Sequence, residues 1–349
     1  MIYYVVSKDE ARAFLRFVRM YIPTLARQVT VLPYWRFALR RRLLPGTYIF
    51  SQTETLPRPL AMAVGRICDD LSCRPGFRVL NRPDQTLGRY ALLKCLHQEG
   101  LNKFQVFRMD APVTSARLPV FIRRETDHCG SQTRLLRTPE EFQNALHVIG
   151  PDADRAEKCL IVEFCNTADP HGNYRKYSVV IIGDRLVPRH LLFGQTWMTK
   201  WVSAVLSEAQ IREEQEFVDQ NPHAAQLRRI FALANIQYGR IDYALLDGKV
   251  QTWEINSNPM LASDGDYSQH PARKYVQDRF GERIRTAFEA NDISEAGKPY
   301  WVGLASGTRV IWNVLAAAVR RKLVHHQRRE MRNKLEALGF DLAAERANS

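Results

Sequence analysis

The sequence predicts an α+β protein that opens with a small α/β domain, and two features of its pattern predict this class. Over residues 1–85, short apolar segments alternate with helix-like segments, as in parallel strands joined by helical crossovers. Farther along, apolar segments follow one another across Gly183-Asp184 and Asp247-Gly248, pairs that favour hairpin turns between antiparallel strands. A chain of 349 residues is long enough to bury the cores of two or three such units.

The elements of the first unit follow from apolar periodicity and from turn residues. We predict strands over 2–6, 47–50 and 77–80, and helices over 8–20 and 60–71. The strand at 47–50 comes directly after the turn pair Pro45-Gly46. No GxGxxG follows the first strand, so the dinucleotide-binding fingerprint is absent.

The rest of the chain divides into two α+β subdomains and a tail. A helix over 89–98 ends at Gly100, and Pro139 followed by two acids marks the start of another helix. Further strands are predicted at 104–108, 119–123, 160–165, 177–182, 185–190, 238–246 and 250–256, and further helices at 207–219 and 223–234. From about Trp301 the chain is helical in character. The predicted domains are an α/β unit (1–85), two subdomains (86–160 and 161–290) and a basic helical tail (291–349).

Composition and cysteine spacing predict a cytoplasmic protein. Hydrophobic residues make up 45% of the chain and charged residues 25%, which is ordinary for a soluble globular protein. None of the six cysteines forms a CxxC pair or has zinc-finger spacing, so we expect reduced thiols. The first residues lack the pattern of a signal peptide, and no apolar stretch of about 18 residues predicts a membrane-spanning helix.

The net charge of +13 is concentrated in two places, residues 40–42 and 320–334. An excess of this kind suits nucleic acid, an anionic membrane or an acidic substrate as a partner. It equally suits a solvated helix face together with an interior that handles nucleotides. Charge alone therefore does not decide between these partners.

The segment 238–259 carries the most chemical information, because it is a predicted hairpin with acids on its strands. Glu254 and Asn256 are two residues apart in one strand and therefore face the same side. Magnesium prefers hard oxygen ligands, and Asp242 on the other strand is a third candidate ligand. A two-residue turn would point Asp242 away from Glu254, whereas a longer loop or a bulge sets them opposite each other. We predict the longer loop; an ordinary amphipathic hairpin with solvated polar residues is the alternative.

The same segment resembles the ATP-grasp superfamily. Members such as D-alanine–D-alanine ligase and glutathione synthetase share an arginine and an aspartate on one strand and Glu-x-Asn-x-x-Pro on the next. The matching residues are Arg240, Asp242, Glu254, Asn256 and Pro259. The resemblance implies an ATP-grasp fold in which two α+β subdomains clasp ATP. It further implies that Asp242, Glu254 and Asn256 hold Mg²⁺ and that Arg240 steadies the transferred phosphate.

Other segments resemble parts of this family in the same order along the chain, and the resemblance implies ATP-binding roles for them. Arg123 stands where the family has a phosphate-binding lysine, and a guanidinium can also bind phosphate. Residues 128–132 are similar to the glycine loop that closes over the phosphates, and Leu160–Cys165 to the strand that clasps adenine. The residues implied in ATP binding are Lys94, Arg123, Gly130, Ser131, Glu163, Phe164, Arg175 and Lys176.

The activity implied by the resemblance is a ligase that joins a carboxylate to an amine through an acyl phosphate. The substrates would be an amino acid or peptide, with ATP and Mg²⁺ as cofactors. Two other functions stay open: a nucleotide-binding regulatory or scaffold protein without turnover, and an interaction of the basic tail with membrane or nucleic acid. The sequence does not identify the substrates or the oligomeric state.

Overall fold

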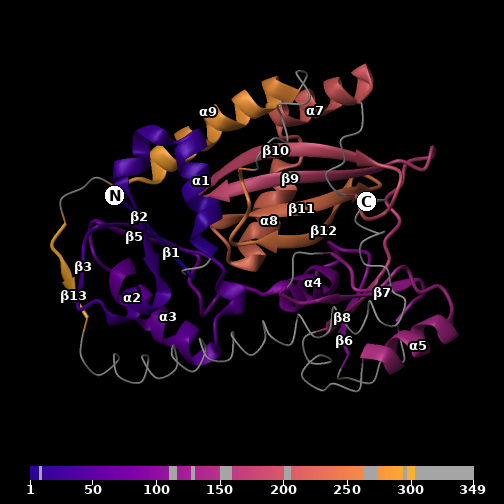
Figure 1. Cartoon of the computed structure of the whole chain (residues 1–349), viewed down its shortest axis with the longest axis horizontal. Helices are drawn as coiled ribbons and strands as arrows, with labels where there is room; N and C mark the ends of the chain where they lie inside the picture. Colours follow the sequence, from indigo (N-terminus) through magenta and orange to yellow (C-terminus); the bar gives the residue numbers. More distant parts are fainter. Residues whose placement is uncertain are drawn as a thin grey trace.

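The computed structural model describes residues 1–7, 10–109, 116–126, 130–149, 159–199, 206–262, 273–293 and 297–302. The basic tail beyond residue 302, and with it the predicted membrane or nucleic-acid contact, lies outside the described residues. His128 and Cys129 of the predicted glycine loop lie outside them as well. Figure 1 shows an N-terminal unit beside two further sheets, with the three-stranded sheet below the four-stranded one.

The N-terminal unit is the predicted parallel α/β domain. Its sheet has the order β2 (Val29–Pro33), β1 (Ile2–Val6), β4 (Gly46–Phe50) and β5 (Phe77–Leu80), and every neighbouring pair is parallel. Alternate residues of β1 enter two different cores, as expected for a sheet covered on both faces. The covering elements are α1 (Ala11–Tyr21) on one face and α2 (Tyr34–Leu39) and α3 (Arg58–Ser72) on the other, and two short 3₁₀ turns, Pro23–Gln28 and Thr53–Thr55, complete the unit.

The next subdomain is built on a three-stranded antiparallel sheet. The strand order is β6 (Val106–Arg108), β8 (Cys159–Glu163) and β7 (Val120–Arg124). Leu93 of α4 (Arg89–Gln98) packs in the core on one side, and Phe142 of α5 (Pro139–Ile149) packs in the core on the other. The predicted boundary between residues 160 and 161 falls inside β8, whose pairing places the whole strand in this sheet.

The third unit is a four-stranded antiparallel sheet with the order β10 (Arg185–Gly194), β9 (Tyr174–Ile182), β11 (Tyr238–Leu246) and β12 (Lys249–Asn256). One face carries the odd-numbered residues of β9 and packs on α7 (Glu208–Gln220) and α8 (Ala224–Ala234). On the other face, Val180, Ile182 and Tyr238 are apolar and enter the core shared with α1 and α9 (Lys274–Asn291). Farther along the same face, Ser178 of β9, Asp242 of β11 and Glu254 of β12 are polar, and they form part of the site described below.

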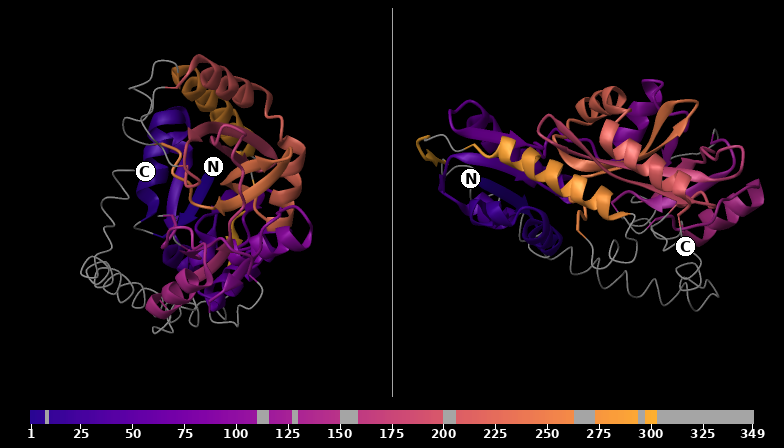
Figure 2. Two further views of the ribbon diagram at one scale, coloured as in Figure 1. Left: turned by 90° about the vertical axis from the view of Figure 1, so that its right-hand side faces the viewer. Right: turned by 90° about the horizontal axis from the view of Figure 1, so that it is seen from above.

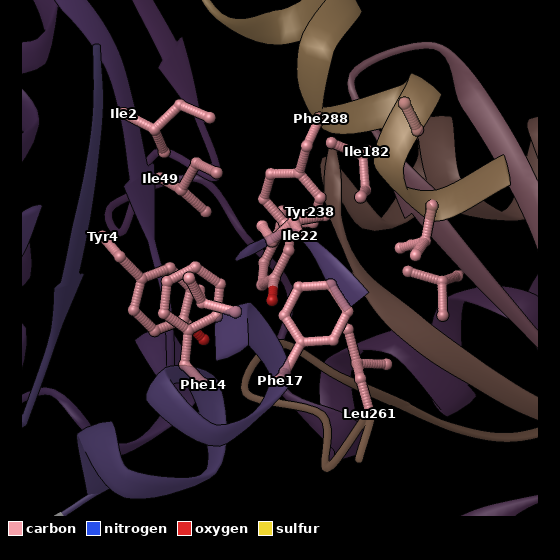
Figure 3. Close-up of a cluster of buried hydrophobic side chains, with 14 of the residues drawn as sticks. Ile2, Tyr4, Phe14, Phe17, Ile22, Ile49, Ile182, Tyr238, Leu261 and Phe288 are labelled. Carbon is pink, nitrogen blue, oxygen red and sulfur yellow. The ribbon is translucent and has the colours of Figure 1, made fainter. Parts of the chain in front are cut away.

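The apolar core that joins the N-terminal domain to the four-stranded sheet contains many aromatic residues. Figure 3 shows Phe14 and Phe17 of α1 pointing toward Phe288 of α9 and Tyr238 of β11. Helix α9 contacts α1, α7, β9 and β10 and, as seen in Figure 2, runs along both units. Burying several aromatic side chains in one cluster contributes much of the free energy that fixes the two units together.

The described part of the C-terminal segment returns to the N-terminal domain. β13 (Tyr300–Trp301) pairs antiparallel with β3 (Arg42–Leu43), so Trp301 itself lies in a strand, and the predicted helical tail beyond residue 302 lies outside the described residues. The backbone of Trp301 pairs with that of Arg42 in a two-stranded sheet. None of the described helices is both long and apolar enough to cross a membrane.

Candidate active site

The hairpin of β11 and β12 places Asp242 directly opposite Glu254 and Arg240 opposite Asn256. This pairing is the one the sequence predicts, but the predicted longer loop is wrong. The turn has only two residues, Asp247 and Gly248, and both have left-handed φ values (52° and 73°), as tight hairpin turns require. The register shifts instead at a bulge beside Asp242, where Trp253 is the extra residue.

A row of polar side chains crosses the sheet at this level. Asp242 lies opposite Ser178 of β9, and Ser178 lies opposite His190 of β10, so the row extends from Glu254 to His190. Burial lowers the pKa of His190 well below its ordinary range, and the surrounding cations, Arg189 first among them, lower it further. The imidazole is therefore neutral at pH 7.

Asp242 is nearly buried and is compensated by two cations. Ser178 Oγ donates to its carboxylate at 2.6 Å, and Arg240 donates from Nε at 2.9 Å and from a terminal nitrogen at 3.2 Å. Lys176 Nζ lies 3.9 Å from Asp242 Oδ2. Since a buried carboxylate is costly unless it is paired and hydrogen-bonded, these partners explain how the charge is held there.

Glu254 lies between two arginines. Arg123 donates to Glu254 Oε2 at 2.9 Å, and Arg89 donates to the same oxygen. Arg89 is the first residue of α4 and also donates to the backbone carbonyls of Arg124 at 2.9 Å and Glu125 at 2.6 Å. It thus ties the helix to the end of β7 and to β12.

Sequence reasoning missed Arg89. The one signal that points to it is its position, because a cation in the first turn of a helix opposes the helix dipole and needs an acidic or carbonyl partner. The sequence gives no indication that this partner is Glu254, which is 165 residues away.

A cavity of about 230 Å³ lies between the two subdomains and is lined from both sheets. One group of lining residues is charged or borders the glycine loop: Arg123, Gly130, Ser131, Arg175, Lys176, Asp242 and Glu254. A second group is aromatic or apolar: Leu93, Phe104, Phe121, Val162, Phe164, Cys165, Tyr174, Trp197, Met198 and Trp253, with Thr167 and Thr199 beside them. Burial raises the pKa of the Cys165 thiol to about 11, so this cysteine is protonated rather than nucleophilic at pH 7.

Most of the predicted ATP-binding residues line this cavity, and four of the predicted site residues do not. Arg240 reaches the cavity only through its ion pair with Asp242. Asn256 follows Glu254 by two residues, and its Oδ1 accepts a hydrogen bond from the Asn258 backbone at 2.8 Å. Lys94 is exposed, with its ammonium 5.8 Å from the Tyr90 ring. The fourth is Glu163.

Glu163 faces away from the cavity and is bound by neighbouring segments. Its carboxylate accepts hydrogen bonds from the backbone N–H groups of Gln105 (3.0 Å) and Arg117 (2.9 Å) and from the Arg117 guanidinium (2.8 Å). Burial by itself would raise the pKa of Glu163, but these hydrogen bonds outweigh it and the pKa is lowered. The backbone N–H of Phe164 donates to the Pro119 carbonyl at 2.9 Å, although its ring lines the cavity.

Arg175 lines the cavity while bound to two acids. It donates to Asp169 at 2.8 Å and to Glu213 at 2.6 Å. The hydrogen bond from Arg175, together with backbone N–H groups, lowers the pKa of Asp169 to about 2. Arg175 therefore holds a loop and a helix in place at the cavity wall.

The residues present fit a magnesium ion by their donor chemistry. Asp242 and Glu254 provide two carboxylates at facing positions, and Asn256 provides an amide oxygen on the same face of the hairpin. Within the described ranges no group of three or more His, Cys, Asp or Glu side chains could hold a metal, and the predicted set of Asp242, Glu254 and Asn256 contains only two residues of these types. Glu254 can hold a metal only if the guanidiniums of Arg89 and Arg123 move toward another anion.

The fold and the cavity together define a protein with a parallel α/β domain followed by two α+β subdomains that enclose a site rich in cations and aromatic rings. No protein-family model matches the chain, and no curated protein matches its sequence.

Several solved structures are similar to this chain in the path of the backbone. D-alanine–D-alanine ligase from Coxiella burnetii matches over 95% of this chain and 98% of its own, with 12% identity and a TM-score of 0.48. The same kind of ligase from Bacillus anthracis, complexed with ATP, matches over 83% and 99%, with 12% identity and a TM-score of 0.44. A RimK domain ATP-grasp protein from Sphaerobacter thermophilus matches over 80% and 98%, with 13% identity and a TM-score of 0.44. A likeness at this level establishes neither an activity nor a substrate.

Proposed function

We propose that this protein is an ATP- and Mg²⁺-dependent ligase that joins a carboxylate to an amine through an acyl phosphate. The observation that carries the proposal is the position of Asp242 opposite Glu254 at the wall of a cavity that Arg123 and Lys176 also line. The resemblance of segment 238–259 to the ATP-grasp motif supports the same reading. We further propose that the substrates are an amino acid or a peptide and that the protein acts in the cytoplasm.

In this proposal Asp242, Glu254 and Asn256 hold the metal, which when bound neutralises charge on the nucleotide phosphates. Arg123 and Lys176 contact the phosphates, and the loop at Gly130 and Ser131 covers them. Arg240 steadies the transferred phosphoryl group and keeps Asp242 oriented through its two hydrogen bonds of 2.9 and 3.2 Å. Lys94, the other predicted phosphate ligand, is exposed and does not line the cavity, so its predicted role lacks the support that Arg123 and Lys176 have.

The chain contributes mainly position and charge, which are what phosphoryl transfer requires. The cavity has both kinds of lining that ATP needs, cations for the phosphates and aromatic rings for the base. When phosphates enter, Arg123 exchanges its bond to Glu254 for a bond to a phosphate oxygen, and Arg89, which donates to the same carboxylate oxygen, has to turn toward another anion as well. A planar guanidinium suits this exchange because carboxylate and phosphate present similar oxygen geometry.

The experiment that tests the proposal measures ADP release from ATP and Mg²⁺ in the presence of amino acids and dipeptides. We expect Glu254→Gln and Asp242→Asn to lower turnover at least 100-fold, or about 2.7 kcal/mol at 1.36 kcal/mol per factor of ten. Glu208→Gln is the matched control, since its side chain is on the exposed face of α7, and it should leave turnover unchanged. Full turnover by folded Glu254→Gln protein would show that the site is assigned wrongly.

A nucleotide-binding regulatory protein without turnover is the second candidate function. It is favoured by one observation, the pairing of Glu254 with both Arg89 and Arg123, which neutralises a proposed metal ligand. Tight ATP binding by the wild-type protein, with no ADP release across the whole screen, would favour this function over the ligase.

A further inference from the structure

Six of the residues that line the cavity have aromatic rings, and most of these rings lie close to one another. Trp197 follows β10 and lies 4.8 Å from Phe121 and 6.0 Å from Phe164, measured between ring centroids. Trp253, the bulge residue of β12, lies 5.3 Å from Phe104. These five rings come from both subdomains, so a flat ligand that packs against them would contact both subdomains.

The two groups that the resemblance implies at the edge of the base, the Glu163 carboxylate and the Phe164 backbone N–H, are already bonded within the protein. Glu163 is 2% exposed, and its two oxygens accept hydrogen bonds from Gln105 and from the backbone and guanidinium of Arg117. The Phe164 N–H is donated to the Pro119 carbonyl. An exocyclic amino group that bonded to this carboxylate would displace hydrogen bonds that the buried carboxylate already accepts, which is unfavourable.

The remaining polar side chains beside the rings do not favour one base over another. Thr199 and Thr167 are hydroxyl residues of the lining, and Thr199 Oγ1 donates to the Thr196 carbonyl at 3.1 Å. A hydroxyl group rotates to donate or to accept and therefore tolerates either an amino or a carbonyl group on the base. Stacking on aromatic rings stabilises any base, whatever the pattern of donors and acceptors on its edge.

We propose that this site binds the nucleobase by stacking among Trp197, Phe121, Phe164 and Trp253 and does not use Glu163, so that it accepts ATP and GTP nearly equally. The substrate class is then purine nucleoside triphosphates rather than ATP alone. This inference rests on the proposed nucleotide-dependent function.

The test is equilibrium binding of ATP, GTP and inorganic tripolyphosphate, each with Mg²⁺, followed by calorimetry. For the wild-type protein we expect dissociation constants for ATP and GTP within threefold of each other. Glu163→Gln should keep the same ATP-to-GTP ratio. Trp197→Ala should weaken both nucleotides at least tenfold and leave tripolyphosphate unchanged, whereas Trp197→Phe should retain most of the affinity. Trp35→Ala is the control, since Trp35 is exposed on α2 and does not line the cavity.

Two results would overturn the inference while leaving the proposed function intact. One is ATP binding more than tenfold tighter than GTP binding in the wild-type protein. The other is a selective loss of ATP affinity in Glu163→Gln, which would show that this carboxylate forms a hydrogen bond with adenine. Absence of binding by ATP, GTP and tripolyphosphate alike would overturn the inference and the proposed function together. If Trp197→Ala has a lowered melting temperature, Trp253→Leu replaces it in the comparison and must weaken ATP and GTP binding in parallel, while Trp197→Phe must keep most of the affinity for both nucleotides.

Discussion

At the scale of single residues, Glu163 shows how neighbouring segments determine what a buried acid does. The sequence places it in an apolar strand, where a carboxylate requires a partner, and the structure supplies Arg117 and two backbone N–H groups. The need for a partner is therefore predictable from the sequence. The identity of the partner is not, because Arg117 and Glu163 are 46 residues apart.

The pH dependence of stability tests this arrangement. The pKa of Glu163 is lower in the folded protein than its ordinary value of 4.5, so its contribution is complete above about pH 4.5 and is lost as the pH falls through the folded pKa. We expect the difference in melting temperature between wild type and Glu163→Gln to be largest at pH 6 and to shrink between pH 4.5 and 3. A difference that stays constant down to pH 3 would show that the ion pair does not stabilise the fold.

Arg123 is a second residue whose interactions are only partly predictable from the sequence. Its place in the sequence indicates phosphate binding, and it does line the cavity, yet in this structure it donates to Glu254 at 2.9 Å. The proposed metal ligand and the proposed phosphate ligand are thus each other's partners before any substrate binds. Only the folded arrangement shows this pairing, because 131 residues separate the two.

At the scale of elements, periodicity and turn residues locate most strands and helices correctly. The strand at Tyr238–Leu246 and the helix at Arg89–Gln98 have the predicted bounds, and most others differ by a few residues at their ends. β2, α2 and α9 were not predicted. For α9 the signal was present, since Val276, Phe280 and Ile284 recur at helical spacing and are all buried.

The two hairpins offer a matched comparison of turn glycines. Gly183 (φ 64°) and Gly248 (φ 73°) are both left-handed, so alanine at either position costs about 1–2 kcal/mol in backbone strain. A Cβ at Gly248 would meet nothing within 4 Å, whereas one at Gly183 would overlap the buried side chain of Asn291. Asn291 in turn donates to the carbonyls of Ile182 and Ala287.

We therefore expect Gly183→Ala to lower the free energy of unfolding by about 2 kcal/mol more than Gly248→Ala, the range of overpacking in a filled core. Urea unfolding of the two variants side by side measures the difference. Equal losses would mean that α9 does not pack against the β9–β10 turn as described.

At the scale of the whole molecule, Asn81 connects the N-terminal sheet to the four-stranded sheet. Its side chain donates to the carbonyls of Phe50 (3.0 Å) and Tyr238 (2.6 Å) and accepts from the N–H groups of Gln237 (2.8 Å) and Tyr238 (2.9 Å). All four bonds are lost in Asn81→Ala, and the backbone groups they satisfy are buried between the units.

We expect Asn81→Ala to lower the free energy of unfolding by about 3 kcal/mol or more, at about 1 kcal/mol per buried hydrogen bond. Asn235→Ala is the control, because Asn235 has a similar left-handed φ (54° against 62°) but its side chain makes two hydrogen bonds, an exposed one to Gln85 at 3.0 Å and a part-buried one from Gln237 Nε2 at 3.1 Å, and neither involves a backbone group. For Asn235→Ala we expect the free energy of unfolding to fall by about 1 kcal/mol. Similar losses for the two variants would show that Asn81 does not hold the units together.

The sequence by itself determined the α/β start of the chain, the course of the hairpins and the pairing of Asp242 with Glu254 as a candidate site, because these depend on local periodicity and on residues close together in the chain. It did not determine how that pairing arises: the two-residue turn follows from the left-handed conformations of Asp247 and Gly248, and the bulge at Trp253 corrects the register. Only the tertiary structure decided which cations meet which acids and which rings gather in the cavity. The contacts of Glu254 with Arg89 and Arg123 join segments more than a hundred residues apart, and no local pattern in the sequence specifies which segments will meet.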